Sequence, residues 1–400
     1  MRSRLAQLDA LALTAVIWFL AKFLRYAFPP LFGTLRDGYG VSNAVVGSAF
    51  TALMLAYAAM QFPSGALADR VGGVRVVTAG AVLAALGALV LSLHLPFVGL
   101  VAAMVLVGVG TGAHKTVSVG LLSRIYRDRT GRALGVMDTL GAFGGVVAPA
   151  AVVAALAAGS PGWHAVFLAG GLTGLVLAVL FAWRVPRRVP DPTETGEGER
   201  GLSAYQTLFA DRWFLGFVAV TVLFSFTYNG AVAFLPLYLE EAAGLSPELA
   251  GTLYSGLFLV SLVQVVTGDV SDRVGRLVVV GATLGLATTG LAAVVAVPDA
   301  GPLVLGVAVV AFGLGSHGFR PVRGAYLVEL IPDSVAGGAL GVVRTAIMGV
   351  GAVAPAAVGI VSDVAGFRAA FALLLVALAG ALGLVSVLAV LARGDSTPRR

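Results

Sequence analysis

Long apolar runs alternate with short polar segments along almost the whole 400-residue chain. A run of about 20 apolar residues is long enough to cross a bilayer as a helix. The pattern predicts six such helices on each side of a polar central segment. The expected spans are Leu8–Thr34, Ser42–Phe62, Val74–Leu95, Pro96–Leu122, Ala133–Ala158, Trp163–Val185, Trp213–Leu239, Pro247–Thr267, Leu277–Val297, Gly301–Leu327, Val335–Val361 and Phe367–Leu391.

The composition supports a membrane protein, because 58% of the residues are hydrophobic and only 12% are charged. Average soluble domains carry about a quarter charged residues. The chain contains no cysteine, which excludes disulfides and thiolate chemistry. A net charge of +6 would suggest nucleic acid as a partner of a soluble chain. In a membrane protein it indicates basic loops, so we expect no nucleic-acid partner.

The basic residues also predict an orientation. They gather at the N-terminus, after the second, fourth and eighth spans, in the central segment and at the C-terminus. The loops on the opposite side contain only Arg36 and Arg368. The positive-inside rule then places both termini in the cytoplasm. We expect a multi-pass protein of a prokaryotic cytoplasmic membrane.

One polar turn occurs twice. Asp69-Arg70-Val71-Gly72 follows the second span, and Asp272-Arg273-Val274-Gly275 follows the eighth. Further residues recur in the same order, among them the pairs Gln61 and Gln264, Pro30 and Pro236, and Pro149 and Pro355. The repeat predicts an N-terminal bundle over 1–185, a cytoplasmic linker over 186–211 and a C-terminal bundle over 212–400. Parallel repeats of this kind are a known transporter plan.

At the first copy the chain resembles the major facilitator superfamily. The matching residues of that family's turn motif are Gly65, Leu67, Ala68, Asp69, Arg70 and Gly72. The resemblance implies an all-α membrane protein of twelve transmembrane helices in two pseudo-symmetric six-helix bundles, working by alternating access. It also implies that Asp69 meets the start of the eleventh span, where Arg344 is the only charge. The predicted gating residues are Gly65, Asp69, Arg70, Gly72, Asp272, Arg273, Asp138 and Arg344.

Ionisable residues inside spans cost about 2.5–3.5 kcal/mol each on insertion scales and usually mark function. The spans contain six such cations against one clear acid, Asp138. The cations are Lys22, Arg25, Lys115, Arg320, Arg323 and Arg344. Lys22 and Lys115 are the only lysines of the chain, and both lie in spans that line the central cavity in the family resembled. The excess of positive charge predicts a cavity that binds an anion.

The candidate substrate-binding residues lie in the first, fourth, seventh and tenth spans, and those within one span lie on one face of its helix. They are Lys22, Arg25, Tyr26, His114, Lys115, Tyr228, Asn229, His317, Arg320 and Arg323. Aligning the two repeats pairs His114 with Arg320. The competing interpretation is that some of these cations extend to the membrane surface, and that the two histidines are hydrogen-bonded packing groups.

We therefore predict a secondary active transporter for a small organic or inorganic anion. The first alternative is an exporter of drugs or other amphipathic compounds. The fifth span favours it with a partial glycine-proline motif ending at Ala148-Pro149, whereas the arginine of drug exporters is missing near Met104. A membrane sensor that does not transport ranks lower. The expected partners are the solute, the lipid bilayer and a coupling ion, either a proton or a counter-anion. No catalytic constellation, metal-ligand cluster or cofactor motif was found, so we expect no enzyme.

Overall fold

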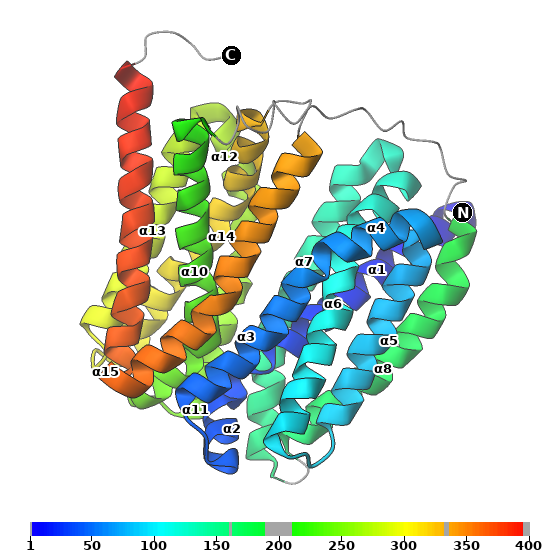
Figure 1. Cartoon of the computed structure of the whole chain (residues 1–400), viewed down its shortest axis with the longest axis horizontal. Helices are drawn as coiled ribbons and strands as arrows, with labels where there is room; N and C mark the ends of the chain where they lie inside the picture. Colours follow the sequence, from blue (N-terminus) through cyan, green and yellow to red (C-terminus); the bar gives the residue numbers. More distant parts are fainter. Residues whose placement is uncertain (1, 160–161, 189–209, 332–335, 395–400) are drawn as a thin grey trace. The chain divides into compact units, whose positions relative to one another are not determined.

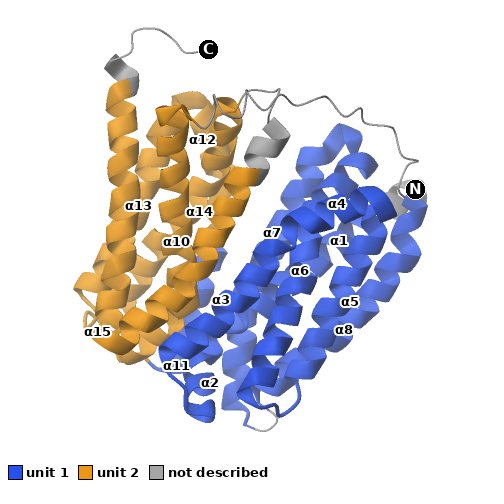
Figure 2. Cartoon of the chain, in the orientation of Figure 1, with its two compact units in different colours: residues 1–194, 246–259 blue, residues 195–245, 260–400 orange. Residues whose placement is uncertain are grey.

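The computed structural model describes residues 2–159, 162–188, 210–331 and 336–394. Every regular element in these ranges is helical, which confirms the predicted all-α fold class. The chain divides into two compact units (Figure 2). Unit 1 comprises Met1–Glu194 and Ser246–Leu259, and unit 2 comprises Thr195–Leu245 and Val260–Arg400. The predicted linker 186–211 lies largely outside the described residues, and the predicted domain boundaries stay predictions.

Unit 1 contains nine of the α-helices. They are α1 (Arg2–Tyr26), α2 (Phe32–Tyr39), α3 (Asn43–Ala59), α4 (Gln61–Val71), α5 (Gly73–Leu91), α6 (Phe97–Ile125), α7 (Thr130–Ala157), α8 (Trp163–Arg184) and α11 (Pro247–Leu259). Three short 3-10 helices accompany them: η1 (Pro29–Leu31), η2 (Arg127–Arg129) and η3 (Val185–Arg188). Helix α5 packs along α6 and α8, while α7 packs on α1 and α11. Figure 1 shows α5, α6 and α8 running side by side.

Unit 2 repeats this plan with fewer and longer helices. They are α10 (Arg212–Glu241), α12 (Val263–Val274), α13 (Arg276–Ala296), α14 (Pro302–Leu330) and α15 (Ala336–Gly394), with the 3-10 helix η4 (Val260–Leu262) before α12. Helix α10 packs on α15, and α13 packs on α14.

Eleven helices of the described residues are long and apolar enough to cross a membrane. The count differs from twelve because α15 joins the last two predicted spans in 59 residues. Gly366 breaks it with φ of 83°, a conformation that glycine adopts without strain. The apolar part of α15, Val342–Leu391, has 50 residues, far more than the roughly 20 that one crossing needs. The break at Gly366 therefore separates the predicted eleventh and twelfth spans.

Three predicted spans are interrupted. The first span is broken at η1, because Pro29 and Pro30 supply no N–H groups for a regular helix, and it continues as α2. The second and eighth each continue beyond their predicted ends, as α4 to Val71 and α12 to Val274. Both extended helices stop at a glycine of the repeated turn. Gly72 has φ of 91° and Gly275 has φ of 97°, and both have ψ of 138°.

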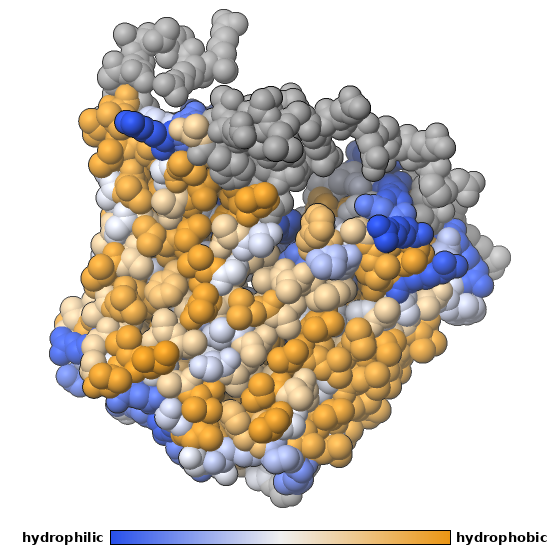
Figure 3. All heavy atoms as spheres, in the orientation of Figure 1, coloured by the Kyte–Doolittle hydropathy of each residue, from blue (hydrophilic) through white to orange (hydrophobic). Residues whose placement is uncertain are grey.

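Close helix contact depends on small residues in both units. In a membrane, association relies on van der Waals packing because the lipid tails are as apolar as the helix surfaces. Gly110 of α6 lies directly on the α5 backbone at Gly80, and Gly315 of α14 lies in the same way on the α13 backbone at Thr283. Apolar side chains cover the lipid-exposed surface over α5 and α8, while hydrophilic residues gather at the helix ends (Figure 3).

Candidate functional site

Three cations of unit 1 surround one tryptophan, Trp18 of α1. The Lys22 and Lys115 Nζ atoms each lie 5.4 Å from the centroid of the Trp18 ring system, and the Arg25 Cζ atom lies 5.5 Å from it. These distances are within the range of cation–π attraction, about 6 Å. We call Trp18, Lys22, Arg25 and Lys115 the Trp18 cluster. The structure thus brings together three of the predicted substrate-binding residues.

The Trp18 cluster is built mainly by helix periodicity. Trp18, Lys22 and Arg25 are spaced by four and then three residues, which places them on one face of α1. Lys115 comes from α6. Arg25 is 6% exposed, donates from Nε to the Ala21 carbonyl at 3.2 Å and lies over the Tyr57 ring at 3.9 Å. Trp18 and Tyr57 were missing from the sequence prediction, although the Trp18–Lys22 spacing is a signal that could have revealed the first.

The indole N–H of Trp18 is buried and has no hydrogen-bond acceptor among the described residues. Buried donors without an acceptor are rare in folded proteins, because each loses its hydration. The indole lies against Gly141 of α7, where a Cβ atom would overlap the ring. The Trp18 cluster therefore contains one buried N–H donor without an acceptor among the described residues and three cationic groups.

One carboxylate accompanies the Trp18 cluster. Lys115 forms an ion pair with Asp138 of α7, and the side chains of the two residues are 16% and 55% exposed. The sequence analysis assigned Asp138 to gating, so this pairing with a predicted substrate-binding residue is a new observation. The pair links α6 to α7 beside the Trp18 cluster.

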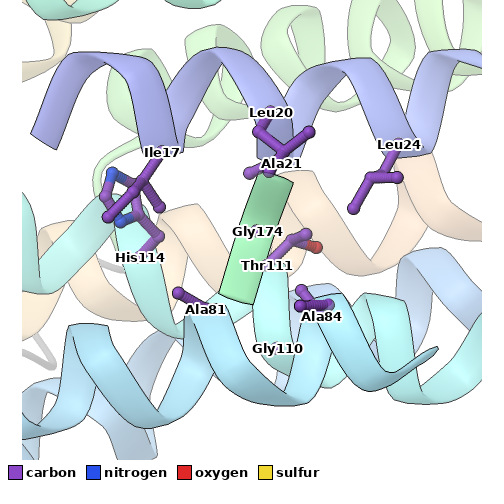
Figure 4. Close-up of a pocket in the computed structure, with 11 residues that line it drawn as sticks. Ile17, Leu20, Ala21, Leu24, Ala81, Ala84, Gly110, Thr111, His114 and Gly174 are labelled. Atoms are coloured by element: carbon purple, nitrogen blue, oxygen red, sulfur yellow. The ribbon is translucent and has the colours of Figure 1, made fainter. Parts of the chain in front are cut away.

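His114 is buried behind Trp18 in the packed interior of unit 1. Its ring stacks on Trp18 with centroids 5.7 Å apart, its Nε2 lies 3.0 Å from the Thr14 carbonyl, and it is 2% exposed. It lines a cavity of about 20 Å³ between α1, α5, α6 and α8 (Figure 4). This space fits about one water molecule and no organic solute. The geometry agrees with the packing interpretation of His114.

Tyr26 is also separate from the Trp18 cluster. Its ring lies against Phe258 of α11, with centroids 4.6 Å apart. Phe258 also packs where Gly145 of α7 exposes its backbone. Tyr26 therefore joins α1 to α11 within unit 1.

A second basic group lies in unit 2, around Tyr228 of α10. The Arg320 Cζ atom lies 4.2 Å from the centroid of the Tyr228 ring, and the His317 ring packs edge-on against the same ring at 5.8 Å. Arg323 lies 6.0 Å from the Phe319 ring. Within the described ranges, no carboxylate forms an ion pair with Arg320, Arg323 or Arg344. We call Tyr228, His317, Arg320 and Arg323 the Tyr228 cluster.

Asn229 serves helix packing in this structure. Its Nδ2 donates to the Ser225 carbonyl at 2.8 Å, and the Ser225 hydroxyl donates to the Ile347 carbonyl of α15 at 2.8 Å. Gly351 of α15 lies close to both side chains, where a Cβ atom would meet them. The hydrogen bonds of Asn229 and Ser225 thus stabilise the packing of α10 against α15.

The glycine contacts fix the register between the two repeats. Gly110 and Gly315 make the same contact with α5 and α13, so these two residues correspond. Counting on from them, His114 corresponds to Phe319. The ring contacts agree, because the Trp18–His114 stack recurs as the Phe224–Phe319 contact, with centroids 4.4 Å apart.

The sequence alignment that paired His114 with Arg320 was wrong by one residue. The structural register pairs Lys115 with Arg320 instead. An alignment of helices rich in Ala, Gly and Val has no strong signal against a shift of one residue, whereas a backbone contact at a glycine does. Both repeats therefore place a cation at the same position of the fourth helix of the repeat.

The predicted gating residues lie at the ends of the helices. Asp69, Arg70, Asp272 and Arg273 are exposed, next to the glycines that end α4 and α12. Gly65 lies within α4, close to Thr116 of α6. Asp69 belongs to unit 1 and Arg344 to unit 2, so their pairing stays a prediction.

Comparisons with known proteins agree with the fold. The crystal structure of a bacterial homolog of the human lysosomal transporter Spinster, inward-facing and unoccupied, covers 99% of this chain and 99% of its own, with a TM-score of 0.80 and 15% identity. A POT family transporter in complex with 5-aminolevulinic acid covers 97% of this chain and 96% of its own, with a TM-score of 0.77 and 16% identity. These likenesses concern the fold.

Three curated relatives are named as transporters. The riboflavin transporter RibZ of Clostridioides difficile (strain 630) is 23% identical over 352 residues, 76% of this chain and 77% of that protein. The probable sulfoacetate transporter SauU of Cupriavidus necator is 24% identical over 288 residues, 66% of this chain and 64% of that protein. The 4-hydroxybenzoate transporter PcaK of Pseudomonas aeruginosa is 32% identical over 152 residues, 38% of this chain and 34% of that protein.

The family profile of the Major Facilitator Superfamily matches residues 14–311 and 244–400, which together span almost the whole chain. This match agrees with the helical repeat, the paired glycine turns and the solved structures of similar fold. The chain belongs to the Major Facilitator Superfamily of membrane transporters.

Proposed function

We propose that this chain is a secondary active transporter that moves a small anion by alternating access. The observation that carries the proposal is the Trp18 cluster, in which three cations lie within 5.5 Å of one ring centroid. Cations inside a membrane protein are costly unless a negative charge compensates them. A bound anion would supply negative charge beside the three cations.

The proposed ligands have different roles. Arg25 offers a planar guanidinium that matches a carboxylate, sulfonate or phosphate, whereas Lys22 and Lys115 act as point charges. The Trp18 indole N–H adds a directional donor. In unit 2, Arg320 stands at the position that corresponds to Lys115, and we assign it the same role for its repeat.

The names of the relatives support an organic anion. Sulfoacetate and 4-hydroxybenzoate are both anions at neutral pH, and SauU and PcaK are named as their transporters. The proposal for this chain is accordingly a small carboxylate or sulfonate. Protons and counter-anions are the proposed coupling ions.

Counterflow in proteoliposomes tests the proposal. A panel of carboxylates, sulfonates and phosphate esters should include a solute that exchanges, and Lys22→Gln or Arg320→Gln should raise its half-saturating concentration roughly tenfold or more. Lys22→Arg keeps the charge and should retain much of the affinity. Arg36→Gln, which lies in α2 outside the Trp18 and Tyr228 clusters and pairs with Asp37, is the matched control. Transport of cationic dyes that all these variants leave unchanged would disprove the anion proposal.

A planar amphipathic compound is the second candidate. The similarity to RibZ over 77% of that protein favours it, as do the aromatic rings of Trp18 and Tyr57 beside the cations. For this solute, Trp18→Leu should impair transport more than Lys22→Gln does. For a small anion without a ring, we expect the opposite order.

A further inference from the structure

A groove opens at one end of unit 1, between α4, α5, α6 and the end of α8. Its volume is about 870 Å³. Arg75 and Arg124 line it together with one carboxylate, Asp69, and its walls include the accessible apolar side chains of Val74 and Ala79. This volume is within the range of known ligand pockets, about 300–1,000 Å³.

The position of the groove along the helices fits the membrane surface. Its lining residues belong to the ends of four candidate spans that lie at the same side, at Val71, Gly73, Ile125 and Arg188. The charged head of a lipid and the water boundary lie at the level of helix ends. The groove therefore combines polar groups at the boundary with apolar walls that reach into the span.

Among the described residues, neither arginine of the groove forms an ion pair with a carboxylate. Arg75 donates only to the Val71 carbonyl of its own turn, at 3.4 Å. No ion pair or hydrogen bond of Arg124 is found among the residues that the structure describes. Asp69 is the single acid of the lining, so positive charge exceeds negative charge there.

The same place in unit 2 is neutralised. Arg276 forms an ion pair with Glu329 at 2.6 Å and donates to the Ala325 carbonyl at 2.8 Å. The register of the repeats pairs Glu329 with Arg124. An arginine of unit 1 thus occupies the position where unit 2 has the neutralising carboxylate.

We propose that the groove of unit 1 binds the phosphate headgroup of an anionic phospholipid. Arg75 and Arg124 hold the phosphate, since guanidinium groups match phosphate oxygens in geometry and charge. Val74 and Ala79 contact the upper part of the acyl chains. Basic pockets between transmembrane helices at the membrane surface are suited to anionic lipids. This inference does not depend on the nature of the transported solute.

Native mass spectrometry of the purified full chain tests the proposal with two lipids of matched acyl chains, phosphatidylglycerol and phosphatidylcholine. We expect the wild type to retain phosphatidylglycerol in preference to phosphatidylcholine. The double variant Arg75→Gln/Arg124→Gln should lower phosphatidylglycerol retention on the order of tenfold. Arg273→Gln, an exposed arginine at the turn of unit 2, should leave retention unchanged.

Two further experiments test the roles of charge and of the acyl chains separately. The double variant Arg75→Lys/Arg124→Lys keeps the charges and should retain the lipid preference, which separates charge from a folding defect. Glycerol 3-phosphate carries the same chemistry without acyl chains and should not compete with the lipid at equal concentration. Equal retention of both lipids by the wild type would overturn the proposal. Unchanged retention in the Gln variant, or full competition by glycerol 3-phosphate, would overturn it as well.

Discussion

Units 1 and 2 share their helix packing and differ in where they place acidic residues. In unit 1 a carboxylate, Asp138, accompanies the Trp18 cluster, while the arginines at the turn have no acid at the position of Glu329. In unit 2 the turn contains the Arg276–Glu329 pair, while no described carboxylate pairs with Arg320. The two repeats thus have opposite patterns of neutralised and unneutralised charge.

The difference separates what the fold requires from what function adds. Close backbone contacts at glycines cannot vary without a steric clash, so they recur in both units. A charged side chain at a helix end or in a cavity changes the packing less and is free to diverge. Where one repeat has an acid and the other does not, the cations of the two repeats differ in their counter-charge among the described residues.

The strongest test of this comparison uses Gly141, which allows Trp18 its place in unit 1. The corresponding residue of unit 2 is Ile347, and the smaller ring of Phe224 stands where Trp18 would be. Gly141→Ala would place a Cβ atom into the indole. Displacing Trp18 moves the centre of the Trp18 cluster, and we expect a loss of transport efficiency up to about a hundredfold in counterflow.

Ala142→Gly, next in the chain, is the control for Gly141→Ala, because it adds no atoms at the Trp18 face. It should affect thermal stability slightly and leave the half-saturating concentration unchanged. If Gly141→Ala transports normally, Trp18 does not position the cations. The Trp18 cluster would then not account for the difference between unit 1 and unit 2.

The packing side of the comparison predicts equal effects at Gly110 and Gly315. Alanine at either position would overlap a neighbouring helix backbone, which cannot move aside as a flexible side chain could. We expect each variant to lose about 2–3 kcal/mol of stability, seen as a fall in melting temperature of roughly 5–10 °C. Gly120→Ala and Gly324→Ala, where nothing lies within 4 Å, should be neutral or slightly stabilising. A large effect in one unit alone would contradict equivalent packing.

The charge side of the comparison predicts opposite effects at Asp138 and Arg344, which correspond in the repeat. Asp138→Asn releases Lys115 from its carboxylate, so an anion should bind more tightly, with a half-saturating concentration about three to ten times lower. Arg344→Gln removes a cation and should raise that concentration. Counterflow at several solute concentrations measures both, and a shift of the two variants in the same direction would refute the comparison.

The sequence was sufficient for the architecture, and it identified the cations that the structure brings together around Trp18. The apolar runs predicted the helical spans, and the repeated Asp-Arg-Val-Gly turn predicted two glycine turns whose backbone angles nearly coincide. Lys22, Arg25 and Lys115 were identified because charged residues inside apolar runs stand out. The break at Gly366 lies in the predicted gap between the eleventh and twelfth spans, 361–367.

The sequence could not predict which side chains on different helices contact one another. The Lys115–Asp138 pair joins α6 to α7, and its formation depends on helix rotation rather than on spacing along the chain. His114 has the same sequence signal as a ligand, yet it contacts the Thr14 carbonyl in the packed interior. The register error of one residue has the same origin, because only the contact of Gly315 with α13 distinguishes Phe319 from Arg320.

The smallest expected effect concerns the ion pair that unit 1 lacks. Glu329→Gln breaks the contact with Arg276, but the two side chains are 52% and 25% exposed, so water replaces much of the lost interaction. Exposed pairs contribute about 0.2–1 kcal/mol, and we expect a fall in melting temperature of roughly 1–3 °C. Asp272→Asn, whose carboxylate lies 3.8 Å from Arg276, should change it less. Because Glu329→Gln makes the turn of unit 2 resemble that of unit 1, the variant should also retain more phosphatidylglycerol than the wild type. A variant that loses stability without gaining lipid would show that the missing carboxylate does not by itself create the lipid site.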